Sequence, residues 1–224
     1  LVYSGSFSIT AEQTDYVPLR IQGGVSDFNF SWKLKAGETF ETPQAALSYS
    51  GEGLGGISRA HADFIRAYVV NPKYAYARRP MVINNWEATV FNFNNENLFP
   101  IIDEAAKLGL DMFVLDDGWF GARDNDDKGL GDWIVNERKL EGGLDTLIAH
   151  CKEKGLRFGL WFEPEMVNEN SDLFRAHPEY AAIKPGEIPS RSRNQLILDF
   201  SKKEVVDYVY SLMSAILKKH EISY

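Results

Sequence analysis

The stretch AAKLGLDMFVLDD, residues 105–117, decides the fold, because it joins the end of an amphipathic helix to an apolar strand that finishes in two acids. Gly109 follows the last apolar position of the helix, where a glycine commonly ends a helix. The apolar run MFVL comes next, as expected for a strand that is covered on both faces. The stretch therefore predicts a helix, a glycine turn and a strand of a parallel sheet.

The same plan returns in CKEKGLRFGLWFEPE, residues 151–165, where Gly155 again separates a helix from an apolar strand with an acidic end. A shorter apolar strand, MVINNW at residues 81–86, precedes both copies. Apolar strands that alternate with amphipathic helices indicate a parallel sheet with helices on its outer face. Acids at successive strand ends favour an α/β fold of the (β/α)8 TIM-barrel type. A doubly wound sheet is the rival, but no GxGxxG turn follows the first strand.

The domain organisation follows from this pattern. About four or five strands fit into residues 81–224, so we expect the first half of an eight-stranded barrel there. Residues 1–54 are typical of β structure, with an alternating FNFSWKL at residues 28–34. Residues 55–80 are expected to form a helical linker. The chain opens inside a strand-like run and stops as ISY begins another strand, so we expect it to be part of a longer protein.

Two capping signals predict where helices begin. Ser58 stands before an apolar helical pattern and is the expected cap of the linker helix. Ser201 and Glu204 have the spacing of a capping box and are expected to open the last helix.

Composition narrows the classes of function. The chain has 224 residues, 44% of them hydrophobic, and a net charge of −8, which disfavours binding to nucleic acid or to a membrane surface. Its one cysteine excludes an internal disulfide and fits a reducing compartment. No apolar run reaches the roughly 18 residues of a spanning helix, and no signal-peptide pattern is visible. We therefore predict a cytoplasmic location.

The pair Asp116–Asp117 in FVLDDGWFG, residues 113–121, is the first candidate site. An Asp–Asp pair is most often a structural turn or helix cap. Here, however, the pair ends a buried strand, where a barrel places its ligand. Carboxylates accept hydrogen bonds from sugar hydroxyls, and an aromatic ring such as Trp119 packs on a sugar face. The pattern therefore favours a carbohydrate site.

The other strand ends carry similar side chains. Each of these residues alone could be part of the core or of a salt-bridged surface, but tryptophan beside acids or amides at three strand ends favours a sugar site. The candidates are Asn84, Asn85, Trp86, Glu87, Trp161, Glu163, Glu165 and Arg193.

Metal and cofactor sites are not predicted. DNDDKGLGDWIV, residues 124–135, resembles a calcium loop, but Lys128 and Val135 stand where oxygen ligands are needed. The sequence has no HExxH, GxSxG or phosphate-binding loop.

Five motifs in order resemble glycoside hydrolase family 36, the bacterial-type α-galactosidases. They are NNWEA (84–88), FVLDDGWFG (113–121), GDW (131–133), GLWFEPEMV (159–167) and RNQLILD (193–199). In addition, residues 31–54 resemble the end of that family's N-terminal β-supersandwich. The resemblance implies a retaining glycosidase whose catalytic (β/α)8 barrel lies between this supersandwich and a C-terminal β domain.

The resemblance also implies roles for individual residues. Asp116 and Asp117 would hold the galactose hydroxyls, including the axial one, Trp86 and Trp161 would line the sugar site, and Arg193 would be the arginine of RNQ. A second tier without firm roles comprises Asn85, Glu87, Trp119, Glu163 and Glu165.

The catalytic residues themselves are expected beyond Tyr224. In the family the nucleophile is the Asp of a Lys-Trp-Asp tripeptide on a strand that begins like ISY, and the general acid/base lies further downstream. Retaining chemistry needs both carboxyl groups, about 5 Å apart across the bond that breaks. Adjacent acids at one strand end diverge, so we assign Asp116 and Asp117 to binding and expect residues 1–224 alone to be inactive.

The sequence therefore predicts an α-galactosidase that acts without a cofactor on terminal α-D-galactosyl residues of melibiose- or raffinose-type oligosaccharides. A homo-oligomer of the full-length protein is left open. The alternatives are an α-N-acetylgalactosaminidase, a galactosyl transferase of the raffinose-synthase type, a non-catalytic sugar-binding protein, and an interaction module led by the β region.

Overall fold

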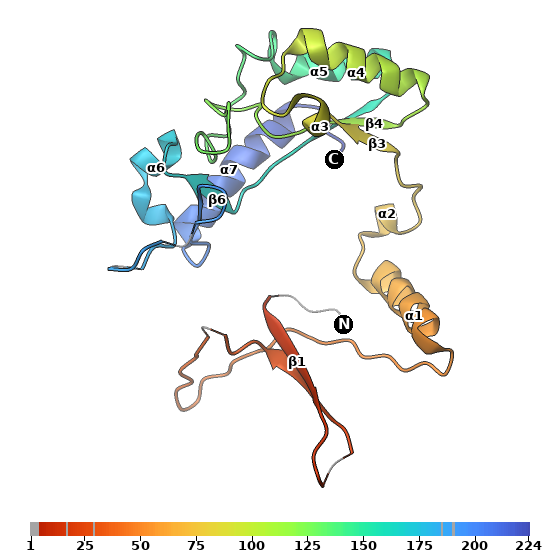
Figure 1. Ribbon diagram of the computed structural model, residues 1–224, viewed down its shortest axis with the longest axis vertical. Coiled ribbons are helices and arrows are strands. Elements are labelled where there is room, and N and C mark those ends of the chain that lie inside the picture. Colours follow the sequence, from red (N-terminus) through yellow and green to blue (C-terminus); the bar gives the residue numbers. More distant parts are fainter. Residues whose placement is uncertain (1–4, 17, 29, 185, 190) are drawn as a thin grey trace. The chain divides into compact units, whose positions relative to one another are not determined.

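The computed structural model describes residues 5–16, 18–28, 30–184, 186–189 and 191–224. The chain divides into two compact units, Leu1–Arg78 and Arg79–Tyr224. Figure 1 shows the helices and strands of each unit, which are described separately below.

The first unit contains an antiparallel hairpin and two helices. Strands β1 (Phe7–Glu12) and β2 (Arg20–Val25) pair residue by residue, from Phe7 opposite Val25 to Glu12 opposite Arg20. Helices α1 (Gly53–Tyr68) and α2 (Pro72–Ala75) follow. None of the residues described in this unit is fully buried.

The strand expected at residues 28–34 is wrong. These residues, as far as they are described, belong to no strand, and Phe28 and Trp32 are 82% and 63% exposed. The rings of Phe30 and Trp32 instead lie 6.1 Å and 5.5 Å from the ring of Phe40. Alternation indicates a face for side chains, but a strand also needs a neighbouring backbone to hydrogen-bond with, and the described residues of this segment pair with no other strand.

The cap expected at Ser58 is also wrong. Helix α1 begins at Gly53, so Ser58 lies inside it. The hydroxyl of Ser50 accepts a hydrogen bond from the backbone N–H of Glu52 at 3.0 Å, and the helix begins at Gly53, five residues before Ser58.

The second unit is built on the parallel sheet that the sequence predicts. Strands β3 (Val82–Asn84), β4 (Met112–Leu115) and β5 (Arg157–Leu160) lie in that order, with β4 in the centre. Met112 is opposite both Val82 and Arg157. Every residue of β4 is buried, which explains its uninterrupted apolar sequence.

The free side of β5 pairs with the C-terminal residues. The N–H of Ser223 donates to the carbonyl of Phe158, and the N–H of Leu160 donates to the carbonyl of Tyr224, both at 2.8 Å. These two bonds agree with the expectation that ISY starts a further strand.

Two helices connect the strands and cover the sheet. Helix α4 (Asn95–Lys107) leads from β3 to β4, and α5 (Gly143–Glu153) leads from β4 to β5; the two helices lie side by side over the sheet (Figure 1). Gly109 and Gly155 have φ angles of 75° and 80°, the left-handed conformation in which a glycine ends a helix. The core between helices and sheet includes Leu98, Ile102, Phe113, Leu115, Leu144, Leu147, Cys151 and Phe158.

A second, smaller core lies around an antiparallel pair, β6 (Met166–Asn168) and β7 (Gln195–Ile197). It is covered by α6 (Asp172–Ala176), the 3-10 helix η1 (Pro178–Tyr180) and α7 (Lys203–Lys219).

The capping box expected at Ser201 and Glu204 is not formed. Helix α7 begins after Lys202, which makes no side-chain cap. The hydroxyl of Ser201 donates to Oδ1 of Asp199 at 2.6 Å, so the nearby carboxylate takes the hydroxyl away from the helix end.

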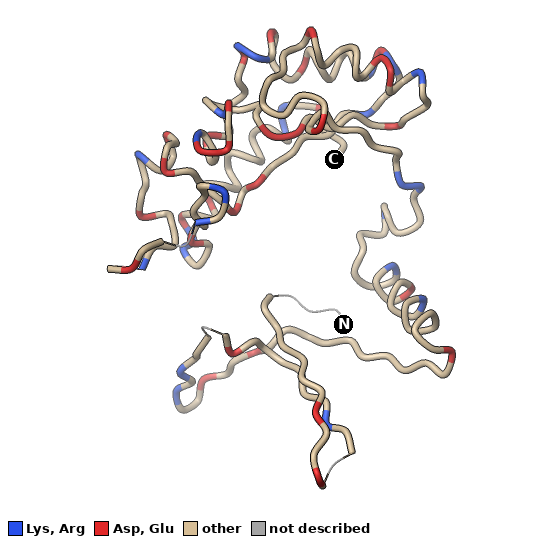
Figure 2. The backbone as a smooth tube through the Cα atoms, viewed as in Figure 1, with Lys and Arg blue, Asp and Glu red and all other residues tan. Residues whose placement is uncertain are grey.

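Charges of both signs are interspersed along both units, as the blue and red positions of Figure 2 show. In the part of the chain that the structure describes, no helix combines the length and the apolar character needed to cross a membrane.

Candidate functional site

The candidate site lies where the parallel strands β3, β4 and β5 end. Because the strands are parallel, their carboxyl ends meet at one edge of the sheet. A short helix, α3 (Trp86–Thr89), follows β3 directly, and the Asp116–Asp117 turn follows β4.

Two asparagines at the end of β3 fix the acid pair that follows β4. Nδ2 of Asn84 donates to Oδ2 of Asp116 at 2.9 Å, and Oδ1 of the buried Asn85 accepts from the backbone N–H of Asp116 at the same distance. Oδ1 of Asn84 also accepts from the N–H of Trp86 at 3.1 Å. The NNW sequence therefore aligns two neighbouring strand ends with each other.

Asp116 keeps a partly exposed carboxylate. Burial raises the pKa of this carboxyl group above its usual range, and the negative charge of Asp117 acts in the same direction. The N–H of Asp117 donates to Oδ1 of Asp116 at 2.8 Å and partly opposes the rise.

Asp117 is in a different environment from its neighbour. It is only 2% exposed, and the fully buried Arg123 grips both of its oxygens. The distances are 3.0 Å from Nε to Oδ1 and 2.8 Å from Nη2 to Oδ2. A carboxylate has about four acceptor positions, so this pair still leaves Asp117 some acceptor capacity. Its role in sugar binding stays a prediction, and it would act together with Arg123.

Sequence reasoning missed Arg123. Its position in the acidic stretch GARDNDD is typical of a surface loop, but the structure buries it completely. Nη1 of Arg123 donates to the carbonyl of Lys128 at 3.1 Å and to Oδ1 of Asn168 at 2.8 Å. One signal in the sequence could have identified it: Arg123 follows six residues after two acids that end a buried strand, and a buried acid needs a positively charged partner.

Trp86 and Trp161 remain partly exposed, as a platform for a sugar ring requires. The ring of Trp86 is held edge-on by Phe91 at 5.1 Å. The ring of Trp161 lies nearly parallel to that of Phe120, with centroids 6.4 Å apart.

Trp119 does not meet the expectation of a sugar-stacking ring. It is fully buried and packs against Phe120 and Phe162. Its Nε1–H donates to the carbonyl of Trp161 at 2.9 Å. Trp119 is therefore a core residue that binds the backbone of Trp161, and its buried ring is not available for stacking on a sugar.

Arg193 is an exposed residue on a tight turn between Ser192 and Gln195. The neighbouring Glu163 is half-buried, and burial raises the pKa of its carboxyl group. The positive charge of Arg193 opposes that rise, which places the two side chains within electrostatic reach of each other. Glu165 and Glu87 are exposed.

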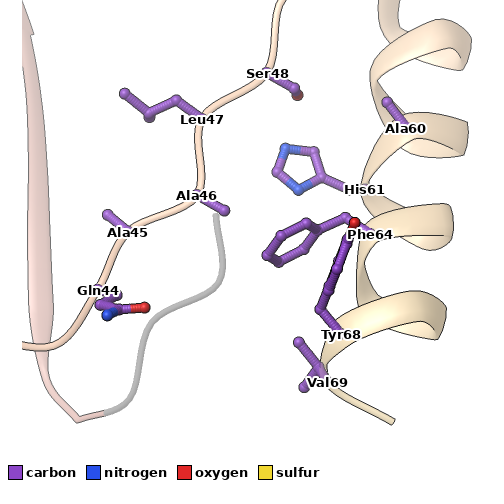
Figure 3. A pocket seen from close by; sticks show the side chains of 10 residues that line it. All are labelled: Gln44, Ala45, Ala46, Leu47, Ser48, Ala60, His61, Phe64, Tyr68 and Val69. Atoms are coloured by element: carbon purple, nitrogen blue, oxygen red, sulfur yellow. The ribbon is translucent and has the colours of Figure 1, made fainter. Parts of the chain in front are cut away.

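Nothing among the described residues assembles a metal site: no group of three His, Cys, Asp or Glu side chains is arranged to hold an ion. In the calcium-like stretch, Asp124 forms ion pairs with Lys128 and Lys139, each at 3.2 Å. The first unit has a cavity of about 640 Å³ between residues 44–48 and α1 (Figure 3), and none of the candidate site residues lines it. His61, Phe64 and Tyr68 point into that cavity from α1.

Comparison with known proteins supplies a family. A family model described as Melibiase matches residues 39–224. Over its whole length the chain is 48% identical to the bifunctional α-galactosidase/sucrose kinase AgaSK of Mediterraneibacter gnavus, and it covers 24% of that protein. It is 45% identical to α-galactosidase 1 of Pediococcus pentosaceus, of which it covers 31%.

Two solved α-galactosidase structures also match the chain over its whole length. The chain superposes on a variant of the GH36 α-galactosidase AgaA from Geobacillus stearothermophilus in complex with raffinose, with a TM-score of 0.94 and 45% identity. Another AgaA variant, in complex with stachyose, gives the same values. In both cases the match covers 100% of this chain and 31% of the solved one. The chain thus spans between a quarter and a third of the length of these proteins.

Proposed function

The chain belongs to the melibiase family, and from that premise we propose that the whole protein is a retaining α-galactosidase that removes terminal α-D-galactose from oligosaccharides. The observation that carries the proposal is the 45% identity, over the entire chain, to an α-galactosidase solved with raffinose. The geometry supports it, because a partly exposed carboxylate and two partly exposed tryptophans stand at one edge of a parallel sheet.

In this proposal the chain supplies recognition of the sugar. Asp116 accepts hydrogen bonds from galactose hydroxyls, Trp86 and Trp161 pack on the ring, and Arg193 donates from the β7 side. Asp117 acts as a second acceptor, held by Arg123. The nucleophile and the general acid/base belong to the part of the protein beyond Tyr224.

We further propose that residues 81–224 form the first half of a (β/α)8 barrel. Its support is the strand order β3-β4-β5, with a helix in each crossover, and the pairing of residues 223–224 with β5. Residues 1–54 as the end of a β-supersandwich, residues 55–80 as a linker, a cytoplasmic location and a homo-oligomer stay predictions that belong to this proposal.

The direct test uses the full-length protein and two nitrophenyl sugars, the α-galactoside and the α-N-acetylgalactosaminide. We expect turnover of the α-galactoside and release of free galactose from raffinose. Faster turnover of the acetylated sugar would favour the galactosaminidase, and galactosylated products would favour the transferase. Binding of galactose without any turnover would favour a sugar-binding protein.

Arg193 offers a sharper test, because a matched control lies two residues away. Arg193→Ala in the full-length enzyme should weaken substrate binding by roughly 1–3 kcal/mol, as expected for a lost charge-assisted hydrogen bond. Arg191→Ala removes an exposed arginine that pairs with Glu169 at 2.9 Å and should leave the kinetics unchanged. Equal kinetics for the two variants would show that Arg193 is not a substrate contact.

A further inference from the structure

We propose that Asn168 is a positioning residue that couples the buried Asp117–Arg123 pair to the turn carrying Arg193, and thereby sets where Arg193 meets the sugar. This inference rests on the proposed function. It concerns a residue that does not reach the sugar itself and acts through its hydrogen-bond partners.

Asn168 stands at the end of β6 with no exposed surface, opposite Gln195 of β7. Its Oδ1 accepts from Nη1 of Arg123 at 2.8 Å and from the N–H of Leu130 at 3.0 Å. Its Nδ2 donates to the carbonyls of Asp126 at 3.1 Å and Asn194 at 2.9 Å. A side-chain amide has two donors and two acceptor positions, so all four are used.

The hydrogen bond from Asn168 to Asn194 ends on an unusual turn. Arg193 and Asn194 have φ angles of 52° and 61°, and the backbone of Ser192 and Gln195 closes the turn at 2.9 Å. Positive φ at both central residues defines the type I′ hairpin turn, which strongly prefers glycine at one of them. The left-handed conformation is unfavourable for an arginine and better tolerated by an asparagine, and the strain at Arg193 persists only where the surroundings hold it.

The hydrogen bond between Asn168 and Arg123 connects Asn168 to the Asp116–Asp117 pair. Arg123 uses Nε and Nη2 on Asp117 and Nη1 on Asn168, so one guanidinium bridges the two side chains. Asp117, Arg123 and Asn168 are each at most 2% exposed. In such a water-excluded setting the hydrogen bonds reinforce one another, and an unpaired group is costly.

A continuous path therefore runs from the end of β4, through Arg123 and Asn168, to the carbonyl of Asn194 beside Arg193. The path joins two predicted sugar contacts, Asp117 and Arg193, that are far apart in sequence. If Asn168 only stabilised the fold, its substitution would lower the unfolding free energy, and its effect on kcat/KM would not depend on the presence of Arg193.

The experiment uses the full-length enzyme and the variant Asn168→Asp. This change keeps an oxygen facing Arg123 and Leu130, but it replaces the donor to Asn194 and Asp126 with an oxygen that repels both carbonyls. We expect kcat/KM on nitrophenyl α-galactoside to fall about 10-fold, mainly through KM, because a binding group is misplaced. The control Asn170→Asp changes an exposed asparagine two residues further along the chain and should stay within about 2-fold of wild type.

A double-mutant cycle separates positioning from structural support. In an Arg193→Ala background the effect of Asn168→Asp on kcat/KM should largely disappear, because the guanidinium of Arg193 that Asn168 positions is already absent. Fully additive losses, or a lower melting temperature with unchanged kcat/KM, would overturn the inference.

A second pair of variants covers the case in which Asn168→Asp does not fold. Asn194→Val places a β-branched residue at positive φ, whereas Asn194→Gly accepts that conformation and keeps the same carbonyl. Asn194→Val should lower kcat/KM clearly more than Asn194→Gly does. Equal values for the two would contradict a role for the turn conformation.

The outcomes also separate this inference from the proposed function. A wild-type protein that fails to hydrolyse α-galactosides would remove the proposed function and, with it, the inference. An active wild type whose Asn168→Asp variant keeps its kcat/KM would remove the inference alone.

Discussion

Asp116 and Asp117 show how two adjacent like charges can stand at the end of one strand. Arg123 neutralises Asp117 inside the protein, whereas Asp116 stays partly exposed and takes hydrogen bonds from Asn84 and from the backbone of Asp117. The two acids therefore have different tasks. Asp117 is held in a buried ion pair, and the more exposed Asp116 is the better candidate for direct contact with a sugar.

The pKa of Asp116 predicts how its charge affects stability. Burial raises this pKa in the folded protein, so the stability that Asp116 contributes is complete below the unfolded-state value of 3.8 and is lost as the pH rises through the folded-state pKa. Asp116→Asn removes the charge, but its single oxygen can accept only one of the two hydrogen bonds from Asn84 and the N–H of Asp117. Relative to wild type, its urea midpoint should therefore be higher at about pH 7 than below about pH 4, where the carboxyl group is also uncharged. A difference between the two proteins that is independent of pH would contradict this reasoning.

Arg123 predicts a large effect on stability. Arg123→Met leaves the carboxylate of Asp117 buried without its partner, so the full-length protein should lose about 3–5 kcal/mol of unfolding free energy in denaturant titration. The control Arg175→Met breaks an exposed pair with Asp172 and should cost less than about 1 kcal/mol. Similar losses for both variants would mean that the buried pair contributes little.

Among the elements, the helix–glycine–strand repeat behaves as its sequence predicts, but the helix starts do not. A capping box does form at α4, where Oδ1 of Asn94 accepts from the N–H of Asn97 at 3.2 Å and Oδ1 of Asn97 accepts from the N–H of Asn94 at 2.8 Å. Ser58 does not cap a helix because α1 begins before it and includes it. Ser201 does not cap α7 because its hydroxyl donates to Asp199 instead.

This difference can be measured with two alanine variants. Asn94→Ala removes a formed capping box and should cost about 1 kcal/mol of unfolding free energy. Ser201→Ala removes an exposed hydroxyl that bonds to Asp199 and should stay within about 0.5 kcal/mol of wild type. A larger loss for Ser201→Ala than for Asn94→Ala would reverse the assignment of the cap.

For the whole molecule, the two units differ in how much apolar surface they bury. Both hydrophobic cores lie in Arg79–Tyr224, and no residue described in the first unit is fully buried. The first unit has a two-stranded hairpin, which is marginally stable without further packing.

Hydrogen exchange on the 224-residue chain should report this difference. We expect slow exchange in β4, α4 and α5, and fast exchange in β1 and β2, because local opening costs little where few side chains are buried. The measurement is peptide-level mass spectrometry at neutral pH. Equal protection of β1 and β4 would show that the hairpin is stabilised by contacts beyond those described above.

The sequence by itself determined the parallel sheet, the glycine ends at Gly109 and Gly155, the acids and tryptophans at strand ends, and the family. These features are local: a helical or extended period, a turn residue and a short motif can be recognised without knowing the rest of the chain. Only the tertiary structure decided that Arg123 is buried against Asp117, that Trp119 is bonded to the backbone of Trp161, and that Asn168 joins Arg123 to the Arg193 turn. The first pair spans only six positions, but its burial does not show in a local sequence typical of a surface loop. The other two hydrogen bonds join residues 42 and 45 positions apart, and no local pattern encodes such pairs.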